Sequence, residues 1–229
     1  MDGMNRYAIY WAPKPGALAD FTARWLGWDP VRGCEVAHPD VAGLPRSVAE
    51  LTATPRKYGF HGTIKAPFLL ADGATGSDLH AATAALCRNL APVALDGLRL
   101  SSVDGFLTLL IEGDDAGLNA LAARAVKELD PFRATADDAE IARRKPDAMT
   151  TGQRAMLDRW GYPYVMDEFR FHLTLTGHFP HSEIDDAREA LAPHLTPLLP
   201  RPFQVNDLCL FGEAEDRRFR ILHRYALGV

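Results

Sequence analysis

The chain contains few cysteines and no long apolar segment. Its three cysteines, Cys34, Cys87 and Cys209, lie far apart along 229 residues, and their odd number suits neither a disulfide framework nor a zinc site. We therefore expect a reducing, cytoplasmic location. No apolar run reaches the about 18 residues that a membrane-spanning helix needs, and no apolar core follows a basic start, so neither a membrane partner nor export is expected.

Lysine is also scarce, and the chain as a whole is acidic. Only five of the 25 basic residues are Lys, and the formal net charge is −5 at pH 7. This balance offers no general attraction for a polynucleotide, so an extended nucleic-acid partner is not expected. Hydrophobic residues make up 47% of the chain and charged residues 24%, which is typical of a globular protein with a substantial core.

Several motifs of phosphate chemistry and hydrolysis are absent. The sequence has no glycine-rich phosphate loop, no G-x-S-x-G elbow and no dinucleotide fingerprint. His172, His178 and His181 are close in sequence but lack the spacing of a helical metal-binding pair, and Pro180 places the last two in a turn. We therefore predict no bound metal, and the site must lie in another pattern.

The order of the predicted elements repeats along the chain. The first half reads as a strand (6–13), a helix (18–28), an irregular connection (29–55), a strand (57–70), a helix from Ser77, and strands near 95–101 and 105–112 that turn at Asp104-Gly105. The second half reads as a helix from 115, a strand (169–179), a helix from Ser182 with a capping-box pattern, and strands near 204–211 and 217–225.

Constant offsets between equivalent positions support a duplication. His61 and His172 are 111 residues apart, and Leu98 and Leu208 are 110 apart. We predict one bilobal domain over 1–229, in which 1–113 is the first lobe and 114–229 the second. Residues 132–168 have no counterpart in the first half, so they are predicted to be a helical insertion, in the place of a lid or specificity element.

Two strand-like stretches carry a polar face opposite an apolar one. In "FRFHLTLTGHF" (169–179), alternation places four apolar residues on one face and four polar residues on the other: Phe169, Phe171, Leu173 and Leu175 against Arg170, His172, Thr174 and Thr176. In "KYGFHGTIKAPFLL" (57–70), His61, Thr63 and Lys65 lie opposite Phe60 and Ile64. Each strand therefore presents a histidine followed by a threonine.

If the two polar faces meet in one cleft, two imidazoles and two hydroxyls gather around one ligand. This set suits in-line displacement at phosphorus. One neutral His takes a proton from the attacking water, and the other, protonated, gives one to the leaving oxygen. Threonine hydroxyls donate to the non-bridging oxygens. This mechanism needs neither a metal nor another cofactor.

The paired motifs "FHGTIKAPF" and "FHLTLTGHF" resemble the 2H phosphoesterase superfamily, which has two H-x-T motifs about half a chain apart. "RYAIYWAP" and "ARRKPDAMTTGQRAMLDRWGYPYVMDEF" resemble its branch of bacterial proteins encoded among phosphonate-breakdown (C–P lyase) genes. The resemblance implies an α+β fold: a bilobal, duplicated β-α-β-β unit with two antiparallel sheets facing a central cleft and helices outside. It makes His61 and His172 the acid–base pair and Thr63 and Thr174 the phosphate donors.

For the superfamily, the resemblance implies opening of a 2′,3′- or 1,2-cyclic phosphodiester, or the reverse ligation. For the branch, it implies a small ribose or nucleotide cyclic phosphate as the substrate, such as a ribosyl 1,2-cyclic phosphate from phosphonate breakdown. The two halves are nearly equivalent, so the sequence assigns neither His as the base. It also leaves the direction of reaction and the oligomeric state open.

Further cations are candidates for phosphate contacts. Lys65 shares the predicted face of His61, and Arg170 shares that of His172, whereas Tyr58 is predicted in the core. In the insertion, four arginines are candidates for holding a second phosphate of a small sugar: Arg143, Arg144, Arg154 and Arg159.

Two alternative functions remain open at this stage. RNA 2′,3′-cyclic phosphate end processing or ligation shares the chemistry but needs a long basic groove, which an acidic chain does not favour. A non-catalytic module that binds a nucleotide or phosphosugar has no need of both histidines and both threonines.

Overall fold

The computed structural model describes residues 2–136, 141–142 and 146–228. Seven antiparallel strands form the main sheet, in the order β11-β10-β1-β4-β8-β7-β6. Their bounds are β1 Arg6–Trp11, β4 Gly62–Phe68, β6 Gly97–Val103, β7 Phe106–Glu112, β8 His172–Thr174, β10 Asp207–Glu213 and β11 Phe219–Ala226. Two short ribbons flank it, β2 (Trp28–Asp29) with β3 (Cys34–Glu35) and β5 (Val93–Leu95) with β9 (Phe203–Val205).

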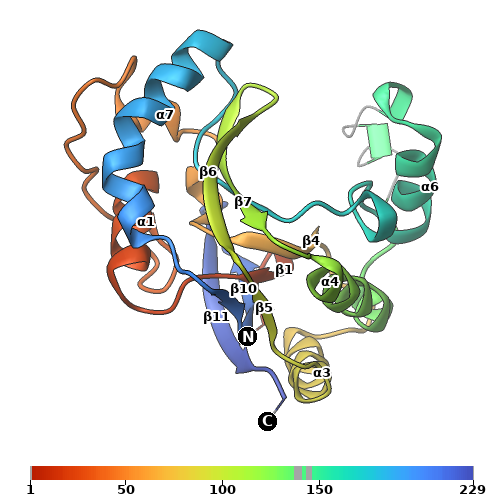
Figure 1. Ribbon diagram of the computed structural model, residues 1–229. Coiled ribbons are helices and arrows are strands. Elements are labelled where there is room, and N and C mark those ends of the chain that lie inside the picture. Colours follow the sequence, from red (N-terminus) through yellow and green to blue (C-terminus); the bar gives the residue numbers. More distant parts are fainter. Residues whose placement is uncertain (1, 137–140, 143–145, 229) are drawn as a thin grey trace.

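Helices surround this sheet (Figure 1). The α-helices are α1 Ala17–Leu26, α2 Val48–Leu51, α3 Gly76–Arg88, α4 Ala116–Glu128, α6 Thr151–Trp160 and α7 His181–Leu195. Single 3-10 turns are η1 Arg56–Tyr58, η2 Asp130–Phe132, η3 Pro146–Ala148, η4 Met166–Glu168 and η5 Thr196–Leu198. Helix α3 packs on β10 and β11, α4 on β4, and α7 on β6 and β7. No helix among the described residues has the length and apolarity to cross a bilayer.

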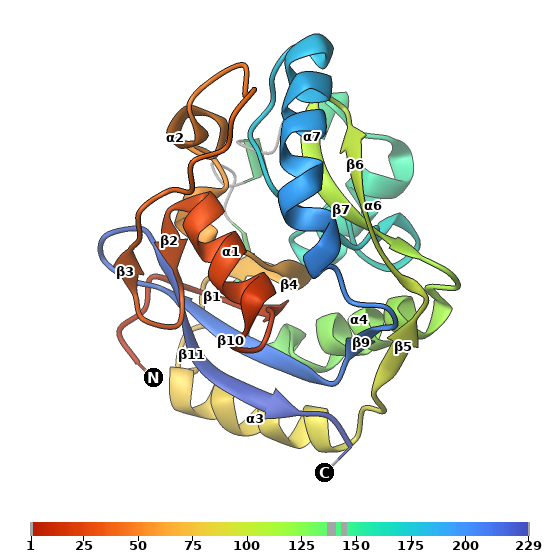
Figure 2. The ribbon, with the colours of Figure 1, turned by 60° about the vertical axis from the view of Figure 1, so that its left-hand side comes forward.

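The two faces of the sheet have different roles, as β1 shows. Tyr7, Ile9 and Trp11 belong to the main core, together with buried leucines of α3, α4 and α7. The intervening Ala8 and Tyr10 belong to a second, smaller cluster on the opposite face. Helices α1 and α7 lie side by side, with Phe21 stacked on His194 at 6.5 Å (Figure 2). The second face, which carries Tyr10, faces the cleft that holds the candidate site.

The predicted α+β class, with antiparallel strands and helices outside, is confirmed. The two sheets expected to face one another are joined edge to edge where the motif strands meet, through the single residue pair Gly62 and Leu173. The predicted lobes, 1–113 and 114–229, are interleaved in this sheet. The hairpin β6–β7 pairs with β8 of the second half, and β10–β11 pairs with β1 of the first half. Each side of the sheet thus takes strands from both halves of the chain.

One predicted local signal is confirmed and another is wrong. Asp104 and Gly105 both have positive φ angles, 45° and 81°, and close the hairpin β6–β7 as predicted. Thr150 caps α6 in a capping box with Gln153, and Gly161 ends this helix in the left-handed conformation. Helix α7, by contrast, begins after Pro180 with no side-chain cap, so the capping box predicted at Ser182 is wrong.

The strand predicted over 169–179 is shorter in the structure. Strand β8 spans only three residues. The 3-10 turn η4 ends just before Phe169, and after Leu175 the hydroxyl of Thr176 takes the place of a backbone carbonyl as the hydrogen-bond acceptor. The Leu107 amide donates to the Thr176 hydroxyl at 2.8 Å, where a continuing strand would offer a carbonyl. The polar face of this segment is therefore short, and it consists of His172 and Thr174.

Candidate active site

The register of β4 and β8 sets the geometry of the four motif side chains. Gly62 lies opposite Leu173 in an antiparallel pair. Continuing this register by one residue each way places His61 opposite Thr174 and Thr63 opposite His172, all on the same face. Side chains directly opposite one another are about 5 Å apart, and those on the diagonal about 7–8 Å. The two imidazoles therefore lie on a diagonal, each beside the threonine of the other motif.

Both imidazoles are oriented by the same backbone contact. The Nδ1 atom of His61 lies 2.8 Å from the Gly59 carbonyl, and the Nδ1 atom of His172 lies 2.9 Å from the Arg170 carbonyl. A carbonyl oxygen only accepts, so Nδ1 carries the proton in each ring. In the neutral imidazole, Nε2 then keeps its lone pair. Each motif thus presents Nε2 as the atom that accepts or gives a proton.

These side chains line one cavity of about 400 Å³. Its walls include His61, Thr63, His172 and Thr174, and the volume suits a small ligand. The hydroxyls of Thr63 and Thr174 have no hydrogen-bond partner within the described part of the chain. Their donors are therefore available to a ligand oxygen.

The two histidines differ in their surroundings. His61 is half-buried and stacks on buried Tyr10, with ring centroids 3.8 Å apart and planes at 22°. Burial lowers the pKa of His61 to about 4; the Gly59 carbonyl offsets part of this change, and nearby His172 adds to it. His172 is exposed at the mouth, with Phe106 at 6.0 Å. His61 is therefore neutral at pH 7.

Two glycines shape the approach to His61. Gly59 has φ 70°, and a Cβ there would lie 2.7 Å from the Pro30 ring, so both its conformation and its packing require glycine. Gly62, the middle residue of the first motif, packs under the Phe171 ring, where a Cβ would lie 2.1 Å from Cζ. The close contact between the two motif strands thus depends on the missing side chain at Gly62.

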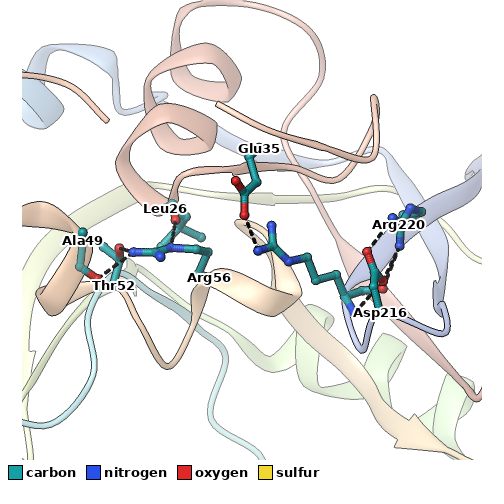
Figure 3. A network of polar contacts seen from close by, with 8 residues as sticks. Leu26, Glu35, Ala49, Thr52, Arg56, Asp216 and Arg220 are labelled. Atoms are coloured by element: carbon teal, nitrogen blue, oxygen red, sulfur yellow. Dashed lines mark hydrogen bonds and ion pairs between the residues drawn. The ribbon is translucent and has the colours of Figure 1, made fainter. Parts of the chain in front are cut away.

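The segment before His61 is fastened by Arg56. Its Nε donates to the Leu26 carbonyl at 2.9 Å, and its Nη2 donates to the Ala49 carbonyl at 2.6 Å and to the Thr52 hydroxyl at 3.0 Å (Figure 3). Nearby, Arg218 pairs with Glu35, which ties the β2–β3 ribbon to the turn before β11. These contacts hold the wall that carries Tyr58 and Gly59.

Lys65, predicted on the polar face with His61, lies elsewhere. Two irregularities in the pairing of β4 with β1 shift the alternation: Thr63 pairs with Tyr10, but Lys65 pairs with Ile9. The Lys65 ammonium is buried against α4, where it donates to the Val126 carbonyl at 3.2 Å and lies 3.5 Å from Asp130. Burial lowers the pKa of Lys65 to about 8, against the raising effect of Asp130. This corrects its predicted place beside the phosphate.

Among the described residues, the other predicted cations do not line the cavity. Arg170 is exposed and donates to the Asp167 and Phe169 carbonyls. Arg154 and Arg159 lie exposed on α6, and Arg143 and Arg144 fall outside the described residues.

The cavity also contains residues that the sequence did not indicate: Arg6, Tyr10, Tyr58, Phe106, Tyr162 and His178. Tyr58 was predicted in the core but is half-buried and lines the cavity. From the sequence, Arg6 and Tyr10 could be recognised only as residues that share one face of the first strand. Tyr162, which belongs to the predicted insertion, lines the cavity. That residues 132–168 act as a lid remains a prediction. Among the described residues, no three His, Cys, Asp or Glu side chains are grouped as metal ligands.

The solved structures similar to this chain include two that match over nearly whole chains. One is described as a phosphoesterase; it has a TM-score of 0.41 at 18% sequence identity and covers 99% of each chain. The other is E. coli LigT complexed with NADP+, with a TM-score of 0.42 at 15% identity and 99% coverage of each chain.

Two curated relatives are named ribose 1,5-bisphosphate phosphokinase PhnN. The protein from Janthinobacterium sp. (strain Marseille) is 37% identical over 80% of this chain and 41% of its own length. The one from Laribacter hongkongensis (strain HLHK9) is 33% identical over 92% of this chain and 48% of its own. The chain thus spans less than half of either relative. The family model described as protein of unknown function (DUF1045) matches residues 63–220, and the chain belongs to this family.

Proposed function

We propose that this protein is a phosphoric diester hydrolase that opens a small ribose or nucleotide cyclic phosphate by paired-histidine acid–base catalysis. The observation that carries the proposal is the convergence of both H-x-T motifs on one cavity, with each Nδ1 bonded to a backbone carbonyl. Two proton-transfer atoms that face one cavity support the proposal, because in-line displacement needs a base on one side of the phosphorus and an acid on the other.

The surroundings of the two rings support a division of roles. Neutral His61 takes a proton from water through Nε2 as the water oxygen bonds to phosphorus. Exposed His172 gives its proton to the departing ester oxygen as the P–O bond breaks, so that the ring opens to a phosphomonoester and a free hydroxyl. The proton on His61 then returns to solvent, and His172 takes one up. Thr63 and Thr174 donate to the non-bridging oxygens, where charge is held.

The substrate class is supported by the size of the cavity and by the relatives. A cavity of about 400 Å³ suits a sugar phosphate or a mononucleotide, and the sequence offers no basic groove for RNA. The curated relatives are named for a kinase of ribose 1,5-bisphosphate, a small phosphorylated ribose. Only that chemical class enters the proposal, because the chain spans less than half of them. A ribosyl 1,2-cyclic phosphate from phosphonate breakdown is the preferred candidate.

The test is turnover of nucleoside 2′,3′-cyclic phosphates and ribosyl 1,2-cyclic phosphates by purified protein and by His61→Ala and His172→Ala. Each variant should lose about 10²–10⁴-fold in kcat while the fold and ligand affinity are kept, because each removes one proton-transfer group. Wild-type protein that binds these compounds without turning any over would favour a binding module. Steep loss of affinity with salt would favour an RNA substrate.

A further inference from the structure

Arg6 is the only Lys or Arg side chain that lines the cavity among the described residues. It begins β1, and its side chain is 29% exposed. The four motif side chains account for one phosphate, and they do not explain a fixed cation at the far end of the same cavity. Arg6 and Tyr10 lie four residues apart on one strand, so their Cα atoms are about 13 Å apart. Arg6 thus begins the strand whose other end carries Tyr10, which stacks on His61.

The guanidinium of Arg6 is held in a fixed orientation. Its Nε and Nη2 donate to the two carboxylate oxygens of Glu213, at 2.6 and 2.8 Å, and Glu213 is buried with 1% of its side chain exposed. The Phe219 ring lies 5.7 Å below the guanidinium. This leaves both N–H groups of Nη1 and one of Nη2 for a ligand. An arginine oriented by a buried carboxylate loses little side-chain entropy when it binds an anion.

Tyr58 also packs on Phe219, and it lies between Arg6 and the His61 ring. Its ring stacks on Phe219 at 5.1 Å and 28°, and it lies 5.8 Å from the His61 ring. The Tyr58 hydroxyl and the Arg6 guanidinium are close enough to interact electrostatically. The Lys57 ammonium lies 4.9 Å from the centre of the Tyr58 ring and adds positive charge beside it. Arg6 and Tyr58 together therefore offer several donors at one end of the cavity.

We propose that Arg6 and Tyr58 form a subsite for a second, non-reacting phosphate of the substrate. The inference rests on the proposed function and narrows its substrate class to cyclic phosphodiesters of a small sugar that carry a phosphomonoester at the other end. The planar fork of Arg6 matches two terminal phosphate oxygens, and the Tyr58 hydroxyl donates to the third. Because Glu213 neutralises Arg6, selectivity comes from directed hydrogen bonds rather than from net charge.

The experiment compares kcat/KM for adenosine 2′,3′-cyclic phosphate with and without a 5′-phosphate. Wild-type protein should prefer the 5′-phosphorylated compound by about 10- to 100-fold, the usual effect of a charge-assisted contact. Arg6→Lys should lose most of this preference, because it keeps the charge but not the fork. The double variant Arg6→Gln/Glu213→Gln should lose all of it without leaving a buried unpaired carboxylate. The preference is the ratio of the two kcat/KM values within each variant, so a change in overall activity does not affect the comparison.

Arg46→Lys is the matched control. Arg46 also pairs with both oxygens of a glutamate, Glu183, and lies 5.3 Å from an aromatic ring, Phe179, but it does not line the cavity. It should leave the preference unchanged. Equal kcat/KM for both compounds in wild-type protein, or a preference that survives in the double variant, would overturn the subsite.

A second readout separates this inference from the proposed function. Ribose 5-phosphate binding is measured by titration calorimetry, which requires no turnover. Binding that weakens at least 10-fold in the double variant but not in Arg46→Lys supports the subsite even if no cyclic phosphate is hydrolysed. Equal binding by wild-type protein and the double variant overturns it, whatever the enzyme hydrolyses.

Discussion

Gly62→Ala is expected to damage the site from its centre. A Cβ at this position would lie 2.1 Å from Cζ and 2.4 Å from Cε2 of the Phe171 ring. Ordinary carbon contacts begin near 3.4 Å, so the ring or the strand must move by about 1.3 Å. Overpacking of this kind typically costs about 1–3 kcal/mol of unfolding free energy. A shift of about 1 Å in catalytic groups can cost about 10²-fold in rate.

The assay combines urea unfolding with kcat/KM on a cyclic phosphate. Because Gly62 forms the single pair that joins the two motif strands, we expect loss of both stability and activity. Gly62→Ala/Phe171→Leu should recover part of both, since the shorter side chain removes the ring atoms in conflict. Gly117→Ala is the control, because its nearest neighbour, in Val93, is at 3.4 Å. Wild-type stability and activity in Gly62→Ala, or strictly additive effects in the double variant, would refute the reasoning.

Three further predictions concern protons, hydroxyls and metals. Burial holds the pKa of His61 near 4, below its unfolded value of 6.5, so the native state should lose stability as the pH falls from about 6.5 to 4; from pH 7 to 5 the loss is about 1–2 kcal/mol in urea unfolding, and His61→Asn should remove it. Thr176→Val should lower the melting temperature, since it leaves the buried Leu107 amide unpaired at a cost of about 1–3 kcal/mol, whereas Thr174→Val should leave stability unchanged and lower kcat about 10²-fold. Equal melting temperatures for the two variants would contradict this assignment. Turnover should persist in EDTA, and its loss with recovery on adding Zn²⁺ would show that a metal takes part.

Much of the candidate site follows from local sequence. His172 and Thr174 are two residues apart in an extended segment, so the chain itself places them on one face, and the same holds for His61 and Thr63. The apolar residues next to the motif histidines and threonines are buried as predicted: Phe60, Ile64, Phe171 and Leu173. The turn signal Asp104-Gly105 acts over a few residues and was predicted for the same reason.

Side-chain alternation predicted the correct face of the sheet only where the pairing between neighbouring strands is regular. Lys65 was assigned to the face of His61, and the irregular pairing of β4 with β1 moved it against α4. Such an irregularity depends on how two distant strands fit together, and no local pattern marks it. Thr176 likewise became a structural residue because its hydroxyl meets the Leu107 amide, 69 residues away.

The sequence by itself determined which residues are the candidates for proton transfer and phosphate binding, because motif spacing and strand alternation are properties of neighbouring residues. Only the tertiary structure decided that β4 and β8 lie side by side, that the hairpin β6–β7 pairs with β8 and the hairpin β10–β11 with β1, and that Arg6 and Tyr58 line the same cavity as His61. These depend on contacts between residues that are far apart in the chain, whose free energy is gained only when the whole sheet closes its core.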